Sequence, residues 1–151
     1  MHIYTSWRRQ KKKRSKIQNK KVGQAPGSII YTGKKLEQKL FIESFNYNKD
    51  TFQEKELPNV EEAFEYKASL PVSWLNINGL NHVDQIEKIG NHYDIHPLVL
   101  EDIVNTAQRP KIDEYEDYLF IVLKMLYYDD NENIVSEQVS FILGKNYVLT
   151  F

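Results

Sequence analysis

The sequence predicts an α/β domain, an αβα sandwich with a mixed sheet that ends in an antiparallel meander. Three patterns indicate this class: a strand followed directly by a helix, a second helix, and three successive apolar strands joined by short polar turns. The 151 residues include 41% hydrophobic residues, enough for one core and too many for a disordered protein. The apolar density of the late strands predicts helices on both faces of the sheet.

Local patterns predict the elements of the first half. The β-branched run 28–32 indicates a first strand, and 40–47 indicates a second. Asp50 is a suitable N-cap for a short helix over 51–56. A proline-containing stop then separates this helix from a second helical stretch over 60–68.

The second half contains stronger signals. The turn residues Asn78-Gly79 end a strand, and apolar residues then recur at helical spacing from Val83 to Gly90. Pro97 suits the first turn of the next helix, where its missing N–H has no partner anyway. We expect helices over 83–90 and 97–104, and strands over 72–77, 118–128, 134–143 and 147–151.

Charge divides the chain into two parts. Residues 1–21 hold nine of the 20 basic residues and no acidic residue, which leaves 11 basic against 21 acidic residues in the remainder. We expect 1–25 to be a disordered basic tail and 26–151 to be the folded domain. The tail is either a solvated leader or a segment attracted to nucleic acid or an anionic membrane face. Its two aromatic residues, Tyr4 and Trp7, are too few for a base-stacking platform.

Several functional classes lack their signatures. The absence of cysteine excludes disulfides and cysteine nucleophiles and fits a reducing, cytosolic setting. The longest apolar run, 118–123, is far shorter than the ~18 residues of a membrane span. Neither a serine nucleophile elbow nor a phosphate-binding glycine loop is present, so we do not expect an enzyme.

Two histidines at a spacing of four, His92 and His96, raise the alternative of a zinc site. The helix end expected near Gly90 and the helix start at Pro97 separate these histidines. We therefore expect the two rings not to share a helix face.

The pair Glu101-Asp102 is more informative. Consecutive carboxylates lie about 100° apart around a helix, so one partner can contact both. They fall late in their helix, where the helix dipole does not favour negative charge. An ion pair with Arg109 or Lys111, or plain solvation, is one explanation. A hard divalent cation such as Mg²⁺ is the other, since it prefers oxygen ligands.

Several motifs occur together in order. They are PGSIIYTG (26–33), WLNINGL (74–80), HPLVLEDI (96–103), QRPK (108–111), YLFIVLKM (118–125) and EQVSFIL (137–143). With these motifs, residues 25–151 resemble the amino-terminal cytoplasmic domain of CorA-type magnesium and cobalt transporters.

The resemblance implies a homo-pentameric inner-membrane channel for Mg²⁺ or Co²⁺, with this domain in its cytoplasmic funnel. The stalk and transmembrane helices of that family follow later in the chain, so we interpret this sequence as ending before them. In the family, the acidic residues at this step bind regulatory Mg²⁺ between subunits, which implies a metal role for Asp102 first and Glu101 second. Without stalk carboxylates, we expect weak Mg²⁺ binding and no stable pentamer.

The leading hypothesis is therefore a Mg²⁺-sensing domain of a CorA-like transporter, whose partners are its own stalk and membrane helices. A nucleic-acid or anionic-surface binding module acting through the basic tail is the alternative, although the tail specifies no sequence reader. A zinc-dependent enzyme comes third.

Overall fold

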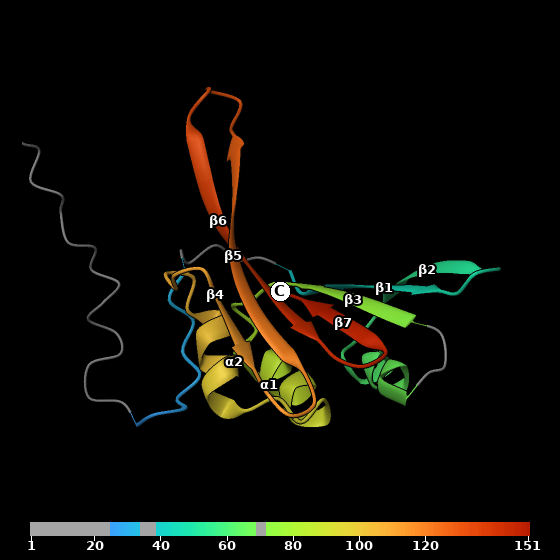
Figure 1. Ribbon diagram of the computed structural model, residues 1–151. Coiled ribbons are helices and arrows are strands. Elements are labelled where there is room, and N and C mark those ends of the chain that lie inside the picture. The colour runs from blue at the N-terminus through green and yellow to red at the C-terminus, as the bar shows by residue number, and fades with distance from the viewer. Residues whose placement is uncertain (1–24, 34–38, 69–71) are drawn as a thin grey trace, which may run out of the picture.

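A mixed sheet forms the body of the domain in the computed structural model, which describes residues 25–33, 39–68 and 72–151. Over these ranges the sheet has seven strands in the order β2-β1-β3-β7-β6-β5-β4 (Figure 1). The basic tail expected over 1–25 lies outside the described residues except for Ala25. The predicted α/β class with a mixed sheet is confirmed.

The elements follow one another in a simple order. They are β1 (Phe41–Tyr47), β2 (Phe52–Leu57), the 3-10 helix η2 (Glu61–Ala68), β3 (Val72–Asn78), α1 (Val83–His92), α2 (Pro97–Val104), β4 (Lys111–Glu114), β5 (Leu119–Tyr128), β6 (Ile134–Leu143) and β7 (Tyr147–Thr150). Both α-helices and the strands predicted in the second half are confirmed within a few residues. The stretch 60–68 is helical as predicted, although it is a 3-10 helix.

The strands join in two antiparallel groups. Strand β1 lies between β2 and β3, while β4 to β7 form a meander, and β3 and β7 make the parallel pair between the groups. The ten-residue strands β5 and β6 pair along their whole length. Their outer halves project beyond the body as a two-stranded ribbon (Figure 1).

Helices cover one face of the sheet. Helices α1, α2 and η2 lie on the same side (Figure 1), and alternate strand residues that point toward them are buried, such as Leu75, Phe120 and Ile142 at 0% exposure. Residues from η2, α1 and α2 join these side chains in one core. A helical layer on the opposite face is not present among the described residues and stays a prediction.

The segment predicted as a first strand, 28–32, is not a strand. It runs beside the end of α2 instead: the Thr32 N–H donates to the Val104 carbonyl at 3.2 Å, and the Thr32 hydroxyl donates to Asn105 Oδ1 at 3.0 Å. The β-branched residues favour an extended backbone, but here the Thr32 N–H forms its hydrogen bond with the end of α2 instead of with a neighbouring strand.

The helix predicted over 51–56 is also wrong, because these residues form β2. Asn48 Oδ1 accepts the N–H groups of Asp50 and Thr51 at 2.8 and 2.9 Å, which closes a hairpin turn. Phe52 then pairs with Tyr47 across the hairpin. Asp50 therefore stands in a turn rather than at a helix cap. Strand β4 was not predicted, since its four residues carry little apolar alternation.

Helix α1 continues to His92 instead of ending near Gly90 as the sequence predicted, and Gly90 lies inside it where α1 meets α2. A Cβ atom at Gly90 would lie 2.4 Å from Leu100 Cδ1, so glycine permits α1 and α2 to approach each other.

Over the described residues, none of the helices combines the length and the apolar character required to cross a membrane.

Candidate functional site

Helix α2 presents the two carboxylates identified in the sequence. His96 caps its start, with Nδ1 accepting the Leu98 N–H at 3.2 Å, and Pro97 occupies the first turn. The side of α2 that packs into the core comprises Val99, Leu100, Ile103 and Val104. Glu101 and Asp102 fall between these positions and are half-buried.

Both oxygens of the Asp102 carboxylate have a donor. Lys111 Nζ, at the start of β4, lies 2.8 Å from Asp102 Oδ2, and Gln108 Nε2 donates to Asp102 Oδ1. The Asp102 side chain is 23% exposed, less than the carboxylates of Asp50, Glu61, Glu62, Asp94 and Asp113 in their ion pairs. Of the two basic partners considered in the sequence, the structure selects Lys111.

The ammonium of Lys111 is held by two carboxylates. It lies 2.6 Å from Asp113 Oδ2 as well, and 5.1 Å from the ring centroid of Phe120. Burial alone would lower the pKa of Lys111, but hydrogen bonds from its ammonium to Asp102 and Asp113 outweigh burial and raise that pKa. Lys111 therefore stays a cation at neutral pH.

Glu101 contacts a different part of the chain. Its Oε2 accepts the backbone N–H of Gly27 at 2.9 Å, and Gly27 has a positive φ of 84°, a conformation that glycine adopts readily. Glu101 thus fastens the loop before Ser28 to α2, while Asp102 faces β4. The two neighbouring carboxylates have separate partners within this domain.

A second polar cluster ties the end of α2 to β5 and β6. Gln138 Oε1 accepts from the Gln108 N–H at 3.1 Å and from Lys124 Nζ at 3.2 Å, and Lys124 also donates to the Thr106 carbonyl at 3.1 Å. Gln138 Nε2 donates to the Asp102 carbonyl at 3.3 Å. Burial lowers the pKa of Lys124. This cluster positions the segment that carries Asp102 and Gln108.

The sequence did not identify Gln108, Asp113, Gln138 or Lys124 as part of this site. Asp113 could have been found only if 111–114 had been predicted as a strand, because residues two apart on a strand share a face and Lys111 precedes Asp113 by two. Gln138 lies 30 positions from Gln108 in the chain, so no local pattern indicates it, whereas Gln108 follows Asp102 by only six positions.

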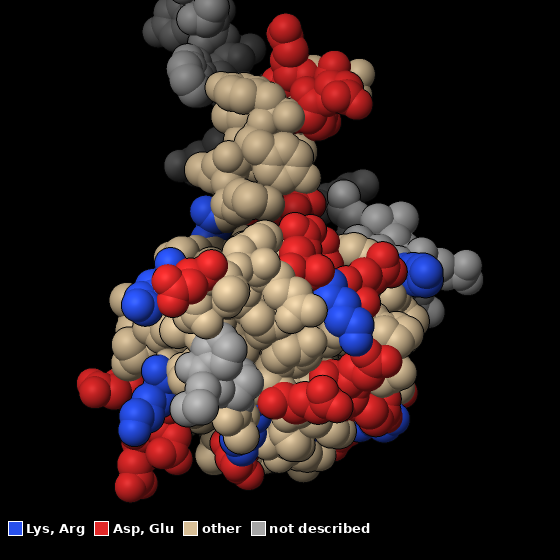
Figure 2. All heavy atoms as spheres, turned by 90° about the vertical axis from the view of Figure 1, so that its right-hand side faces the viewer, with Lys and Arg blue, Asp and Glu red and all other residues tan. Residues whose placement is uncertain are grey.

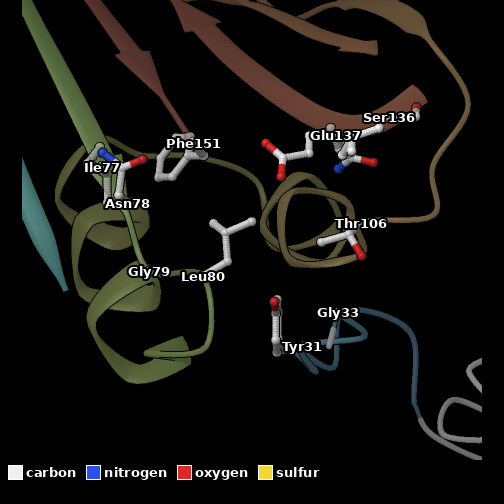
Figure 3. A pocket seen from close by; sticks show the side chains of 12 residues that line it. Tyr31, Gly33, Ile77, Asn78, Gly79, Leu80, Thr106, Ser136, Glu137 and Phe151 are labelled. Carbon is white, nitrogen blue, oxygen red and sulfur yellow. The ribbon is translucent and has the colours of Figure 1, made fainter. Parts of the chain in front are cut away.

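An open pocket of about 370 Å³ lies beside this cluster, between the end of β3 and strand β6. Figure 3 shows the Glu137 side chain and the Tyr31 ring on two sides of it, with Leu80 between them. Burial raises the pKa of Tyr31. The lining residues are Tyr31, Gly33, Ile77, Asn78, Gly79, Leu80, Thr106, Val135, Ser136, Glu137, Gln138 and Phe151. This mixed polar and apolar lining contains a single carboxylate.

The two histidines, His92 and His96, have separate partners within the protein. His92, the last residue of α1, stacks on Phe64 with 4.2 Å between ring centroids, and its Nε2 lies 3.0 Å from the Phe64 carbonyl oxygen. His96 caps α2. As expected, the two rings do not share a helix, although α1 ends at His92 rather than near Gly90. No group of three or more His, Cys, Asp or Glu residues suited to a metal occurs in 25–33, 39–68 and 72–151.

Charge also gathers at the tip of the β5–β6 ribbon. Figure 2 shows uncharged residues along the ribbon and acidic residues at its tip, where the connecting turn contains Asp129, Asp130 and Glu132. Hydrogen bonds from the N–H and side chain of Asn133 lower the pKa of Asp129. Asp129 thus acts as the acceptor that closes the turn.

Comparison with known proteins gives a consistent result. The family model of CorA-like Mg²⁺ transporter proteins matches residues 71–151. The chain is 46% identical over 132 residues to a protein named cobalt/magnesium transport protein CorA from Thermotoga maritima, covering 87% of this chain and 37% of that relative. It is 37% identical over 59 residues to the putative metal ion transporter YfjQ of Bacillus subtilis, covering 39% of this chain and 18% of that relative.

The fold also resembles a solved structure. The soluble domain of CorA from Methanocaldococcus jannaschii superposes with a TM-score of 0.50 at 15% identity, covering 72% of this chain and 39% of that chain. At this identity the likeness shows the fold. This chain therefore spans less than two fifths of each of these similar proteins.

Proposed function

This chain belongs to the family of CorA-like Mg²⁺ transporter proteins, and we propose on that premise that it is a regulatory domain which senses cytoplasmic Mg²⁺ through Asp102 and Glu101. The relative from Thermotoga maritima carries cobalt and magnesium transport in its name. We extend transport of these ions to the longer protein of which this domain would be a part. Transport rather than a catalysed reaction is then the activity.

The observation that carries the proposal is that the Asp102 carboxylate binds a cationic group. Its half-buried carboxylate already binds one positive group, Lys111, with Asp113 beside it. A position that binds an ammonium through carboxylate oxygens has the ligand chemistry that Mg²⁺ prefers. Since the described residues provide no cluster of three metal-binding side chains, the remaining ligands would come from water and from a neighbouring subunit.

In this arrangement the Asp102 carboxylate would exchange one of its present donors, Lys111 or Gln108, for the ion, and Glu101 lies one residue away. Hydrated Mg²⁺ would supply the positive charge that allows carboxylates from two subunits to approach each other. Asp102 can act as a sensor only if its affinity for the ion differs between the closed and open assemblies, because equal binding shifts no equilibrium. High Mg²⁺ would favour closure, and depletion would release it.

The sheet face that none of the described helices covers supports a place in a larger assembly. Large apolar side chains on this face point away from the helices. They are exposed by 39% at Trp74, 66% at Phe52, and 48% at both Leu123 and Met125. A sheet face that exposes this many large apolar side chains is typical of an interaction surface. We propose that 26–151 forms one subunit's share of a cytoplasmic funnel at the inner membrane, in a homo-pentamer whose stalk helices complete the αβα sandwich.

Mg²⁺ titration of the full-length transporter tests the sensor. We expect Asp102→Ala to require much higher Mg²⁺ for closure, measured as suppression of cation current. Glu114→Ala is the matched control, because it removes an exposed carboxylate from the neighbouring strand β4. Closure of the Asp102→Ala channel at the wild-type Mg²⁺ concentration would reject the role of Asp102.

A further inference from the structure

Lys111 places a positive charge in direct contact with the Asp102 carboxylate. Its Nζ is 2.8 Å from Asp102 Oδ2 and 2.6 Å from Asp113 Oδ2, so one ammonium bridges a helix and a strand. The lysine side chain is 33% exposed, against 89% for Lys49 in its pair with Asp50. Partial burial reduces the screening by water and strengthens this pair relative to a surface ion pair.

The surroundings hold this ammonium in place. Lys111 pairs with Val122 of β5 in the sheet. Its ammonium lies 5.1 Å from the Phe120 ring centroid, within the range of a cation–π contact. Gln108 donates to the other oxygen of Asp102. The carboxylate is therefore already satisfied within the domain before any ion arrives.

A divalent cation at Asp102 must compete with these contacts. A carboxylate oxygen that accepts a hydrogen bond from an ammonium is less available as a metal ligand, and two cations at one small site repel each other. We propose that Lys111 is an internal competitor that weakens divalent-cation binding at Asp102, so that binding there exchanges the tethered ammonium for the ion. This inference rests on the proposed function, because it assigns the ion to Asp102.

The competition gives Lys111 a definite role in the response. In a domain whose Asp102 pairs with Lys111, low cation concentrations leave the ion pair intact. Only when the concentration is high enough to displace the ammonium does Asp102 become available to a neighbouring subunit. Lys111 would thus set the concentration at which the site responds, while Asp113 would retain the released ammonium nearby.

Mg²⁺ titration of the 151-residue chain by calorimetry tests this role. We expect Lys111→Met to bind Mg²⁺ about tenfold more tightly than the wild type, on the order of 1.4 kcal/mol. Lys145→Met is the matched control, since it removes the same charge from an exposed position and should leave Mg²⁺ affinity nearly unchanged. Lys111→Arg retains the cation and should stay within about twofold of the wild type.

Further variants separate this inference from the proposed function. Adding Asp102→Asn to Lys111→Met should abolish the gain, and a gain that persists would place the ion elsewhere and contradict both proposals. Equal affinities of Lys111→Met and Lys145→Met would overturn the competitor alone, leaving the channel test of Asp102 to stand. A gain in Lys111→Arg as well would show that packing causes the effect, and would also overturn the competitor role.

Circular dichroism shows whether each variant is folded. Lys111→Gln, which removes the same charge, should show the same gain if the gain does not reflect misfolding.

Discussion

The two faces of the sheet differ sharply although the same strands build both. Along β3, Leu75 and Ile77 point toward the helices and are fully buried, while Val72 and Trp74 point the other way and are 38% and 39% exposed. Both sets are apolar. A strand that is apolar on both faces is typical of a sheet with a layer on each side. The contrast indicates that the helix-covered face stabilises the domain. The other face, called the open face below, exposes apolar side chains that none of the described helices covers.

The open face has some order of its own. Phe45 stacks on Trp74 with 4.7 Å between ring centroids. Trp74 Nε1 donates to Thr150 Oγ1, and that hydroxyl donates to Asn76 Oδ1, each at 2.9 Å. Cross-strand pairs of this kind stabilise a sheet modestly. They keep these side chains in defined positions without covering them.

Truncation in the core face should have the largest effect. Phe120→Ala removes a ring that is 0% exposed in β5, and we expect a loss of about 3–5 kcal/mol in the free energy of unfolding. Urea denaturation measures this loss. Met125→Ala removes a large apolar side chain that is 48% exposed on the other face of the same strand, and a comparable loss there would remove the contrast between the two faces.

The contact between α1 and α2 should be the next most sensitive. Gly90→Ala places a Cβ atom 2.4 Å from Leu100, and overpacking should cost about 1–3 kcal/mol despite the better helix propensity of alanine. Glu87→Ala, on the exposed side of α1, is the control for propensity and should not destabilise. If Gly90→Ala unfolds at the same denaturant concentration as the wild type, the two helices can move apart without loss of stability.

One buried hydrogen bond should contribute less. The Tyr93 hydroxyl donates to the Ala63 carbonyl at 2.9 Å beneath the sheet, and burial raises the pKa of Tyr93 above its ordinary value. Tyr93→Phe should cost about 1 kcal/mol, because the carbonyl loses its donor. Thermal unfolding compared with Tyr128→Phe measures the difference, and equal melting temperatures would contradict the assigned role of this hydrogen bond.

A charge on the open face should have the smallest effect in this chain. Leu123 is 48% exposed, so Leu123→Lys should change the free energy of unfolding by no more than about 0.5 kcal/mol. Val122→Lys, one residue away on the buried face, is the matched control and should unfold the domain. The same Leu123→Lys in a full-length family member should destabilise it if another layer covers this face; equal tolerance there would refute the proposed second layer.

Local patterns predicted most of the second half correctly. Pro97 and His96 mark the start of α2, and Asn78-Gly79 ends β3, because capping and turn chemistry act over a few residues. The meander could be predicted for the same reason, since its strands are long, apolar and separated by polar turns. Glu101 and Asp102 were recognised as a pair from their position late in a helix.

Segments with weaker local signals were decided by the rest of the molecule. Residues 51–56 are mostly polar and could be either an exposed helix or an edge strand, and pairing with β1 selected the strand. Residues 28–32 have high β propensity, but the backbone groups at the end of α2 took the place of a strand partner. Tertiary contacts outweigh propensities of this size.

The sequence by itself determined the α/β class, the family resemblance and the candidate carboxylates, since each depends on residue identity and short spacing. Only the tertiary structure decided that Asp102 pairs with Lys111 rather than Arg109, that Glu101 binds the Gly27 backbone, and that β4 brings Asp113 to the same ammonium. The physical reason is reach: a side chain bonds to whatever the folded chain places within about 3 Å, and that neighbour can come from any distance along the sequence.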